Sequence, residues 1–85
     1  MKILIVEDKS DMRDLLALRV QITGYLPVLA SDGKAGVEKA NQDKPDLILM
    51  NMMMPVMDGW EVARALRASR ETKDIPILAT TALVR

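Results

Sequence analysis

The stretch DLILMNMMMPVMDGW, residues 46–60, decides the fold expected for this chain of 85 residues. Its apolar run at 47–50 has no polar alternation, which is typical of a strand buried on both faces of a parallel sheet. Asn51 follows directly and is therefore expected at the carboxyl edge of the sheet, where open α/β folds bind ligands. An unusually apolar loop then leads to Asp58-Gly59, which turns the chain into a helical pattern beginning at Trp60.

Outward from this stretch, apolar runs alternate with helical patterns. Strands are predicted at 2–6, 25–30, 46–50 and 75–80. Helices are predicted from Ser10, from 31–33, and from about Gly59 to Arg70, with Ser10 as a cap and Leu15 on the inner face of the first. Alternation of this kind predicts a parallel sheet with right-handed crossovers. Pro27 cannot donate to a ladder, which favours an edge position for the second strand.

The composition indicates one small domain and excludes several kinds of function. Twelve basic and twelve acidic residues cancel, so no basic patch indicates a nucleic-acid partner. Cysteine and histidine are absent, which excludes disulfides, thiolate or imidazole catalysis and the usual zinc ligands. No apolar run approaches the ~20 residues of a membrane span. We expect a cytoplasmic protein without membrane partners, and no base, nucleophile or cofactor loop indicates an enzyme.

Polar side chains follow three of the predicted strands, namely Glu7-Asp8, Asn51 and Thr80-Thr81. Because the carboxyl ends of parallel strands share one edge, these groups are expected to form one site. The two acids could be a solvated loop with a capping acid, or oxygen ligands for Mg²⁺. The methionines of the loop could favour a soft metal, but filling of loop and core explains them better without cysteine or histidine nearby.

Residues 46–60 resemble the phosphorylation loop of response-regulator receiver domains of two-component systems, of the chemotaxis-Y-like type. The matching positions are Pro55, Met57, Asp58 and Gly59. The resemblance covers the whole chain and implies a flavodoxin-like, doubly wound parallel sheet of strand order 2-1-3-4. The family continues with a helix, a fifth strand and a last helix. Residues 1–85 are therefore expected to be a single, partial receiver domain, truncated after the fourth strand.

The resemblance also implies roles for individual residues. Asp8 would bind Mg²⁺ directly and Glu7 mainly through water, with the side chain of Asn51 and the backbone carbonyl of Met53 as further ligands. Thr81 would be the switch hydroxyl that follows the phosphoryl group. Asn51 replaces the phosphoacceptor aspartate, and an amide is not a competent nucleophile. Phosphorylation by a histidine kinase or phosphotransfer protein should therefore be blocked, and Mg²⁺ binding should be weakened.

Two functions stay open at this point. The first is a receiver domain in phosphorelay signalling, in which Asn51 is a natural or an engineered replacement. The second is a phosphate-independent interaction module, in which Asn51 caps its loop. The open edge of the fourth strand would present Ile77 and Leu78, which predicts a homo-oligomer formed through that edge.

Overall fold

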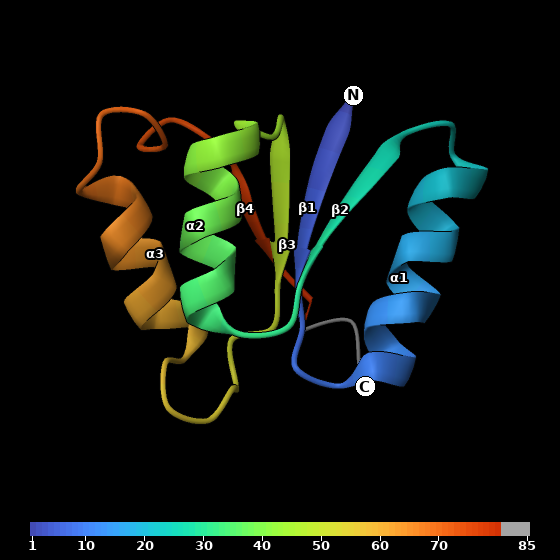
Figure 1. The fold of residues 1–85 in the computed structure, drawn as a ribbon, viewed down its shortest axis with the longest axis horizontal. Coiled ribbons are helices and arrows are strands. Elements are labelled where there is room, and N and C mark those ends of the chain that lie inside the picture. The colour runs from blue at the N-terminus through green and yellow to red at the C-terminus, as the bar shows by residue number, and fades with distance from the viewer. Residues whose placement is uncertain (81–85) are drawn as a thin grey trace.

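The fold alternates strands and helices in the computed structural model, which describes residues 1–80 (Figure 1). In chain order the elements are β1 (Lys2–Val6), α1 (Ser10–Ile22), β2 (Leu26–Ala30), α2 (Gly33–Asp43), β3 (Leu47–Met50), α3 (Gly59–Arg67) and β4 (Ile77–Ala79). Every predicted element is present, although β2 and β3 each begin one residue later than expected and α3 and β4 are shorter by three residues. Helix α3 stops before 70, where the buried Thr72 hydroxyl donates to the Leu66 carbonyl at 2.7 Å. Strand β4 begins after Pro76 because proline has no N–H for the ladder.

The four strands form one parallel sheet in the order β2-β1-β3-β4, as predicted. Strand β2, which contains Pro27, lies at one edge. The register places Val6 opposite both Ala30 and Met50, and Met50 opposite Ala79. The strands therefore end together, and the loops that follow them begin at one edge of the sheet.

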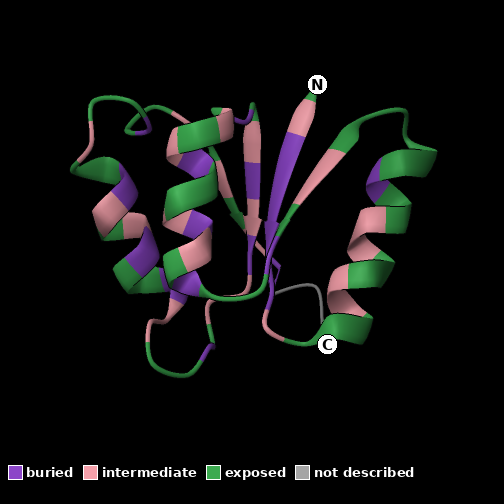
Figure 2. Ribbon diagram, in the orientation of Figure 1, coloured by how far each residue is buried: buried purple, intermediate pink, exposed green. Residues whose placement is uncertain are grey.

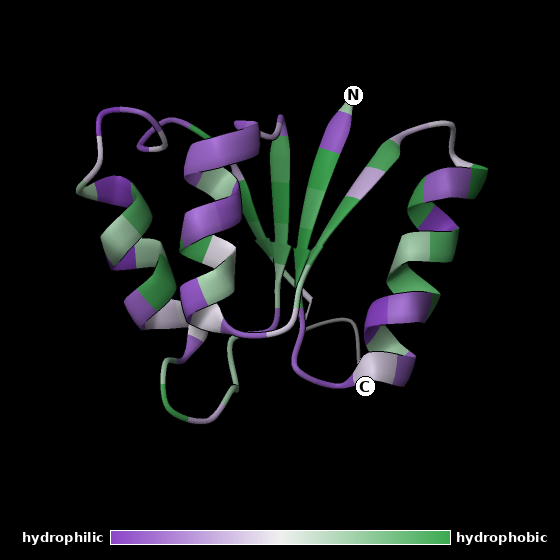
Figure 3. Ribbon diagram, viewed as in Figure 1, coloured by the Kyte–Doolittle hydropathy of each residue, from purple (hydrophilic) through white to green (hydrophobic). Residues whose placement is uncertain are grey.

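Two apolar clusters cover the two faces of the sheet. The larger cluster lies on the side of α2 and α3 and includes Leu4 and Ile48, which are fully buried. The smaller cluster is built by Ile3, Ile5 and Val20 under α1. Figure 2 shows this burial on the inner sides of the helices, and Figure 3 shows that the strands are apolar along most of their length. Within residues 1–80, no helix is long and apolar enough to cross a membrane.

Helix α1 corrects two expectations. Leu15 was expected to face inward, but its side chain is 44% exposed and lies on an outer apolar stripe with Leu18 and Ile22. Helical spacing allowed both assignments because this helix has apolar residues on two sides. Ser10 is the first helical residue rather than the cap, and Lys9 at the cap position makes no side-chain cap hydrogen bond.

The sheet face under α1 becomes less covered toward β4. The register aligns Ile5 with Leu49, and Leu49 with Leu78. Ile5 is fully buried, whereas Leu78 is 52% exposed, because α1 packs against β1 and β2. Ile77 points to the other face and packs against the larger cluster. Of the two residues predicted at the open edge, Leu78 is therefore the one that is exposed.

Gly36 allows α2 to approach β1 closely. A Cβ atom at this position would lie 2.9 Å from one methyl group of Val6 and 3.1 Å from the other. Both glycines on the inner face of α2, Gly33 and Gly36, are buried. The helix-propensity cost of Gly36, about 1 kcal/mol relative to alanine, is thus offset by close packing on the sheet.

We expect Gly36→Ala to destabilise the protein by about 1–3 kcal/mol, because overpacking against the stiff Val6 side chain outweighs the gain in helix propensity. Urea unfolding of the two single variants and of the Val6→Ala/Gly36→Ala double variant gives the coupling free energy between positions 6 and 36. The double variant should recover part of the loss, with a coupling of about 0.5 kcal/mol or more. A Gly36→Ala chain that is more stable than the unaltered chain would contradict this packing.

Candidate functional site

The acidic pair follows β1 at the carboxyl edge of the sheet. Glu7 is only 3% exposed, and its backbone N–H donates to the Ala30 carbonyl at 3.1 Å. Its carboxylate Oε2 accepts the backbone N–H of Lys9 at 3.2 Å. The Arg13 guanidinium donates to the Glu7 backbone carbonyl at 2.9 Å. Asp8 is half-buried beside it.

Asn51 lies directly beside this pair. Its backbone N–H donates to the Val6 carbonyl at 3.0 Å, which extends the ladder between β1 and β3 by one step. Its side-chain Nδ2 donates to Glu7 Oε2 at 2.9 Å and to Asp8 Oδ1 at 3.3 Å. Its Oδ1 accepts the backbone N–H of Met53 at 2.9 Å. The structure thus brings together Glu7, Asp8 and Asn51. Met53 is in contact with Asn51 through its backbone N–H, and not through the carbonyl that the resemblance implied as a ligand.

The donor set fits a hard cation only in part. Carboxylates of Glu7 and Asp8 are suitable ligands for Mg²⁺. At Asn51, however, the N–H side of the amide faces the acids, while the carbonyl oxygen faces the Met53 backbone. Among residues 1–80, no three acidic, histidine or cysteine side chains come together as a metal-binding group. In this arrangement residue 51 presents a donor where a cation would require an oxygen.

The loop between β3 and α3 is held by its methionines and by a capping box. Met54 is buried and Met52 packs against the larger core cluster, in agreement with a filling role for these side chains. A Cβ atom at Gly59 would lie 2.6 Å from the Met52 Cα, so this close approach requires glycine. The Asp58 carboxylate accepts the Glu61 N–H at 3.0 Å, and the Glu61 carboxylate accepts the Asp58 N–H at 3.2 Å.

Val56 is the strained residue of this loop. Its φ is 69°, and its side chain is fully exposed at 101%. A β-branched residue with positive φ is rare because its Cβ crowds the backbone.

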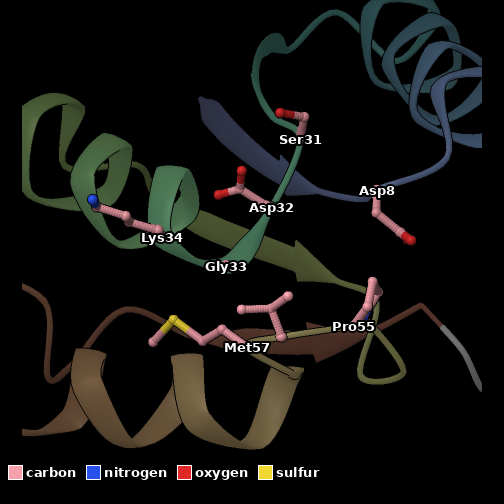
Figure 4. Close-up of a pocket in the computed structure, with 8 residues that line it drawn as sticks. Asp8, Ser31, Asp32, Gly33, Lys34, Pro55 and Met57 are labelled. Carbon is pink, nitrogen blue, oxygen red and sulfur yellow. The ribbon is translucent and has the colours of Figure 1, made fainter.

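A pocket of about 370 Å³ opens beside the acidic pair (Figure 4). Asp8, Ser31, Asp32 and Lys34 supply its polar lining, and the other walls come from Gly33 and from the loop residues Pro55, Val56 and Met57. Figure 4 shows Asp8 and Asp32 at the ends of neighbouring strands, opposite Pro55 and Met57. The sequence reasoning missed the residues after β2. The rule that was applied to the other three strand ends would have included Ser31 and Asp32.

The two threonines after β4 have different outcomes. Thr80 is buried, and its backbone N–H donates to the Met50 carbonyl at 2.9 Å, so it extends the ladder beyond β4. Thr81, predicted as the switch hydroxyl, lies outside the described residues.

Comparison with known proteins agrees with this geometry. The family model of the response regulator receiver domain matches residues 3–84. The DNA-binding dual master transcriptional regulator RpaA of Synechocystis is 40% identical over 82 residues, which are 96% of this chain and 34% of RpaA. The chain spans about a third of the length of the curated relatives it matches.

Solved structures show the same likeness. The N-terminal domain of a response regulator receiver protein from Methanoculleus marisnigri superposes with a TM-score of 0.89 and 36% identity, over 92% of this chain and 63% of that one. The receiver domain of a sensor histidine kinase from Pseudomonas aeruginosa, described with a magnesium ion coordinated in its active site cleft, gives a TM-score of 0.87 and 33% identity, over 92% and 64% of the two chains.

We expect Val56→Asn to stabilise the protein by about 1 kcal/mol, because asparagine adopts positive φ at lower cost than valine. Thermal unfolding measures the gain. Val56→Ala is the matched control, since alanine also removes the exposed methyl groups but keeps a Cβ and has no side-chain group that favours positive φ. An equal gain from alanine would show that loss of the exposed methyl groups, and not relief of backbone strain, is the cause.

Proposed function

The chain belongs to the family of response regulator receiver domains, and on this basis we propose that it is a receiver whose phosphoacceptor position is occupied by an amide. The observation that supports this most is the place of Asn51, which directly follows β3 and is hydrogen-bonded to both acids after β1. Residues 1–85 would act as one receiver module within phosphorelay signalling.

The chemistry of position 51 determines what this receiver can do. Phosphoryl transfer to a receiver needs a carboxylate oxygen that attacks phosphorus and forms an acyl phosphate. The Asn51 amide has no anionic oxygen, and its nitrogen lone pair is delocalised into the carbonyl. The module would therefore not store phosphate, and we assign it no enzyme activity of its own.

Magnesium binding would be weak for the same reason. Receiver domains generally bind Mg²⁺, and this chain keeps the carboxylates of Glu7 and Asp8 and the backbone of Met53 near residue 51. An aspartate at position 51 would add a third negative charge, whereas asparagine adds none. We propose that any Mg²⁺ is held mainly by Asp8, with Glu7 acting through water and with the Met53 carbonyl as a further ligand.

The partners follow from the family. A histidine kinase or a phosphotransfer protein is the partner class for which this surface evolved, and the module would act in the cytoplasm, where such kinases phosphorylate their receivers. Thr81 remains our proposed switch hydroxyl on the basis of the resemblance, since a hydroxyl can donate to a phosphoryl oxygen. Without phosphate this hydroxyl would have no oxyanion to follow.

A second candidate function is phosphate-independent self-association. Within residues 1–80, β4 pairs only with β3, so its outer edge has backbone groups without a strand partner. Leu78 is 52% exposed on that strand. Edges of this kind favour pairing with another chain. We therefore propose a homo-oligomer formed through β4 as the alternative role.

We expect no stable phosphoryl label at residue 51 when the chain is incubated with radiolabelled acetyl phosphate and Mg²⁺. An Asn51→Asp variant, placed in a longer version of the protein that includes the remainder of the family's fold, should take up the label. The same longer version with Asn51 retained is the control. Label at residue 51 of the unaltered protein would disprove the proposal.

The oligomer is tested by light scattering over a wide range of concentration. We expect a mass above that of the monomer for the unaltered chain and a monomer for Leu78→Lys, because a charge on the exposed edge opposes strand pairing. Leu26→Lys on β2, where leucine is 60% exposed at the opposite edge, is the matched control and should leave the mass unchanged. Ile77 is less suitable, because it packs against the core. A monomer at all concentrations would exclude this role.

A further inference from the structure

The side-chain amide of Asn51 lies between two carboxylates that come from the same loop. Its Nδ2 donates to Glu7 at 2.9 Å and to Asp8 at 3.3 Å. One nitrogen with two hydrogens therefore bridges two acids, both of which carry oxygens that could hold a hard cation. The bridge joins the ends of β1 and β3 through side chains, in addition to the backbone ladder.

The hydrogen-bond partners determine which way this amide faces. Ionised carboxylates only accept, and the backbone N–H of Met53 only donates. Rotating the amide by half a turn would place its oxygen against the two acids and its NH₂ group against the Met53 N–H. Acceptor would then face acceptor at both acids, and donor would face donor at Met53. The observed orientation of the amide is therefore the one that these partners permit.

The acids depend on this bridge because they have few other donors. Glu7 is 3% exposed, and a carboxylate that is buried must be hydrogen-bonded or paired. Within residues 1–80, the ion pair of the chain joins Lys44 to Glu71, and no lysine or arginine pairs with Glu7 or Asp8. The Arg13 guanidinium donates to the backbone carbonyl of Glu7 instead. Among the residues that the structure describes, the donors to the Glu7 carboxylate are the Lys9 N–H and the Asn51 amide.

We propose that Asn51 is an internal substitute for the divalent cation: its amide holds Glu7 and Asp8 together in the metal-free protein, and Mg²⁺ must displace it in order to bind. This inference rests on the proposed receiver function, because that function identifies the acidic pair as a cation site. It goes further by making the amide a competitor of the metal rather than one of its ligands. At a given Mg²⁺ concentration, a larger share of the protein would therefore keep the metal-free arrangement than in a chain without the amide.

Calorimetric titration with Mg²⁺ separates a competitor from a ligand. Asn51→Ala removes both the amide N–H groups and the amide oxygen. If the amide competes, this variant binds Mg²⁺ more tightly than the unaltered chain, by about fivefold, which corresponds to one hydrogen bond that no longer has to be broken. If Asn51 is instead a ligand through its oxygen, Asn51→Ala binds more weakly, and that result would overturn the proposal. Equal affinities would overturn it as well.

Thermal unfolding in EDTA and in millimolar Mg²⁺ gives a second measurement, which does not depend on the binding isotherm. In EDTA, Asn51→Ala and Asn51→Asp should both melt about 5 °C or more below the unaltered chain, as expected for the loss of one hydrogen bond in a domain of this size. Mg²⁺ should raise the Tm of both variants, most for aspartate, and raise the Tm of the unaltered chain less than that of either variant. If Asn51→Asp folds only in Mg²⁺, that outcome would also support the proposal, because it means that the loss of the amide has to be offset by the metal.

Asn41→Asp is the matched control, since Asn41 is also half-buried and donates to the carbonyl of Val37 on its own helix. Its Tm should respond to Mg²⁺ as that of the unaltered chain does. A Mg²⁺ response of the unaltered chain as large as that of Asn51→Asp would overturn the proposal. The proposed function is tested separately, because phosphoryl label at residue 51 would contradict it. That result would leave the comparison of Tm values unaffected.

Discussion

The pairing of β1 with β3 in parallel is the constraint on which the site depends. Because Val6 lies opposite Met50, the residues that follow each strand emerge side by side, and Asn51 continues the ladder by donating to Val6. The close approach of α2 at Gly36 presses on the same Val6 side chain from one face of the sheet. A shift of the register by one residue would move Asn51 away from Glu7 and would exchange the side chains that one strand presents to the two apolar clusters.

At this edge of the sheet, an amide at position 51 gives the site less negative charge than a third carboxylate would. Three carboxylates held close together repel one another and require a cation, whereas two carboxylates bridged by an NH₂ group do not. The family model covers position 51 and the elements on both sides of it, and in this chain Asp58 and Glu61 form a capping box after the loop. In the proposed function, asparagine at position 51 would keep the shape of a receiver and remove the charge that phosphoryl transfer uses.

The fold was predictable from the sequence, and the orientations within it were not. Apolar runs and the Asp58-Gly59 turn were enough to predict the sequence of strands and helices along the chain and a parallel sheet. Pro27 was enough to predict an edge strand. The convergence of Glu7, Asp8 and Asn51 followed from topology alone. Leu15 was misplaced because α1 has two apolar sides. The direction of the Asn51 amide depends on donors and acceptors from separate segments, which a sequence pattern does not show.

The hydrogen bonds of the Asn51 side chain can be observed directly by NMR of the ¹⁵N-labelled chain without metal. The chain has two asparagines, so the Asn51 NH₂ signal is assigned by its loss in the Asn51→Ala variant. We expect its protons to exchange with water more slowly than those of the exposed Gln21, and to keep their chemical shifts as Mg²⁺ is raised through the micromolar range. Exchange as fast as that of Gln21 would contradict the bridge between the two acids.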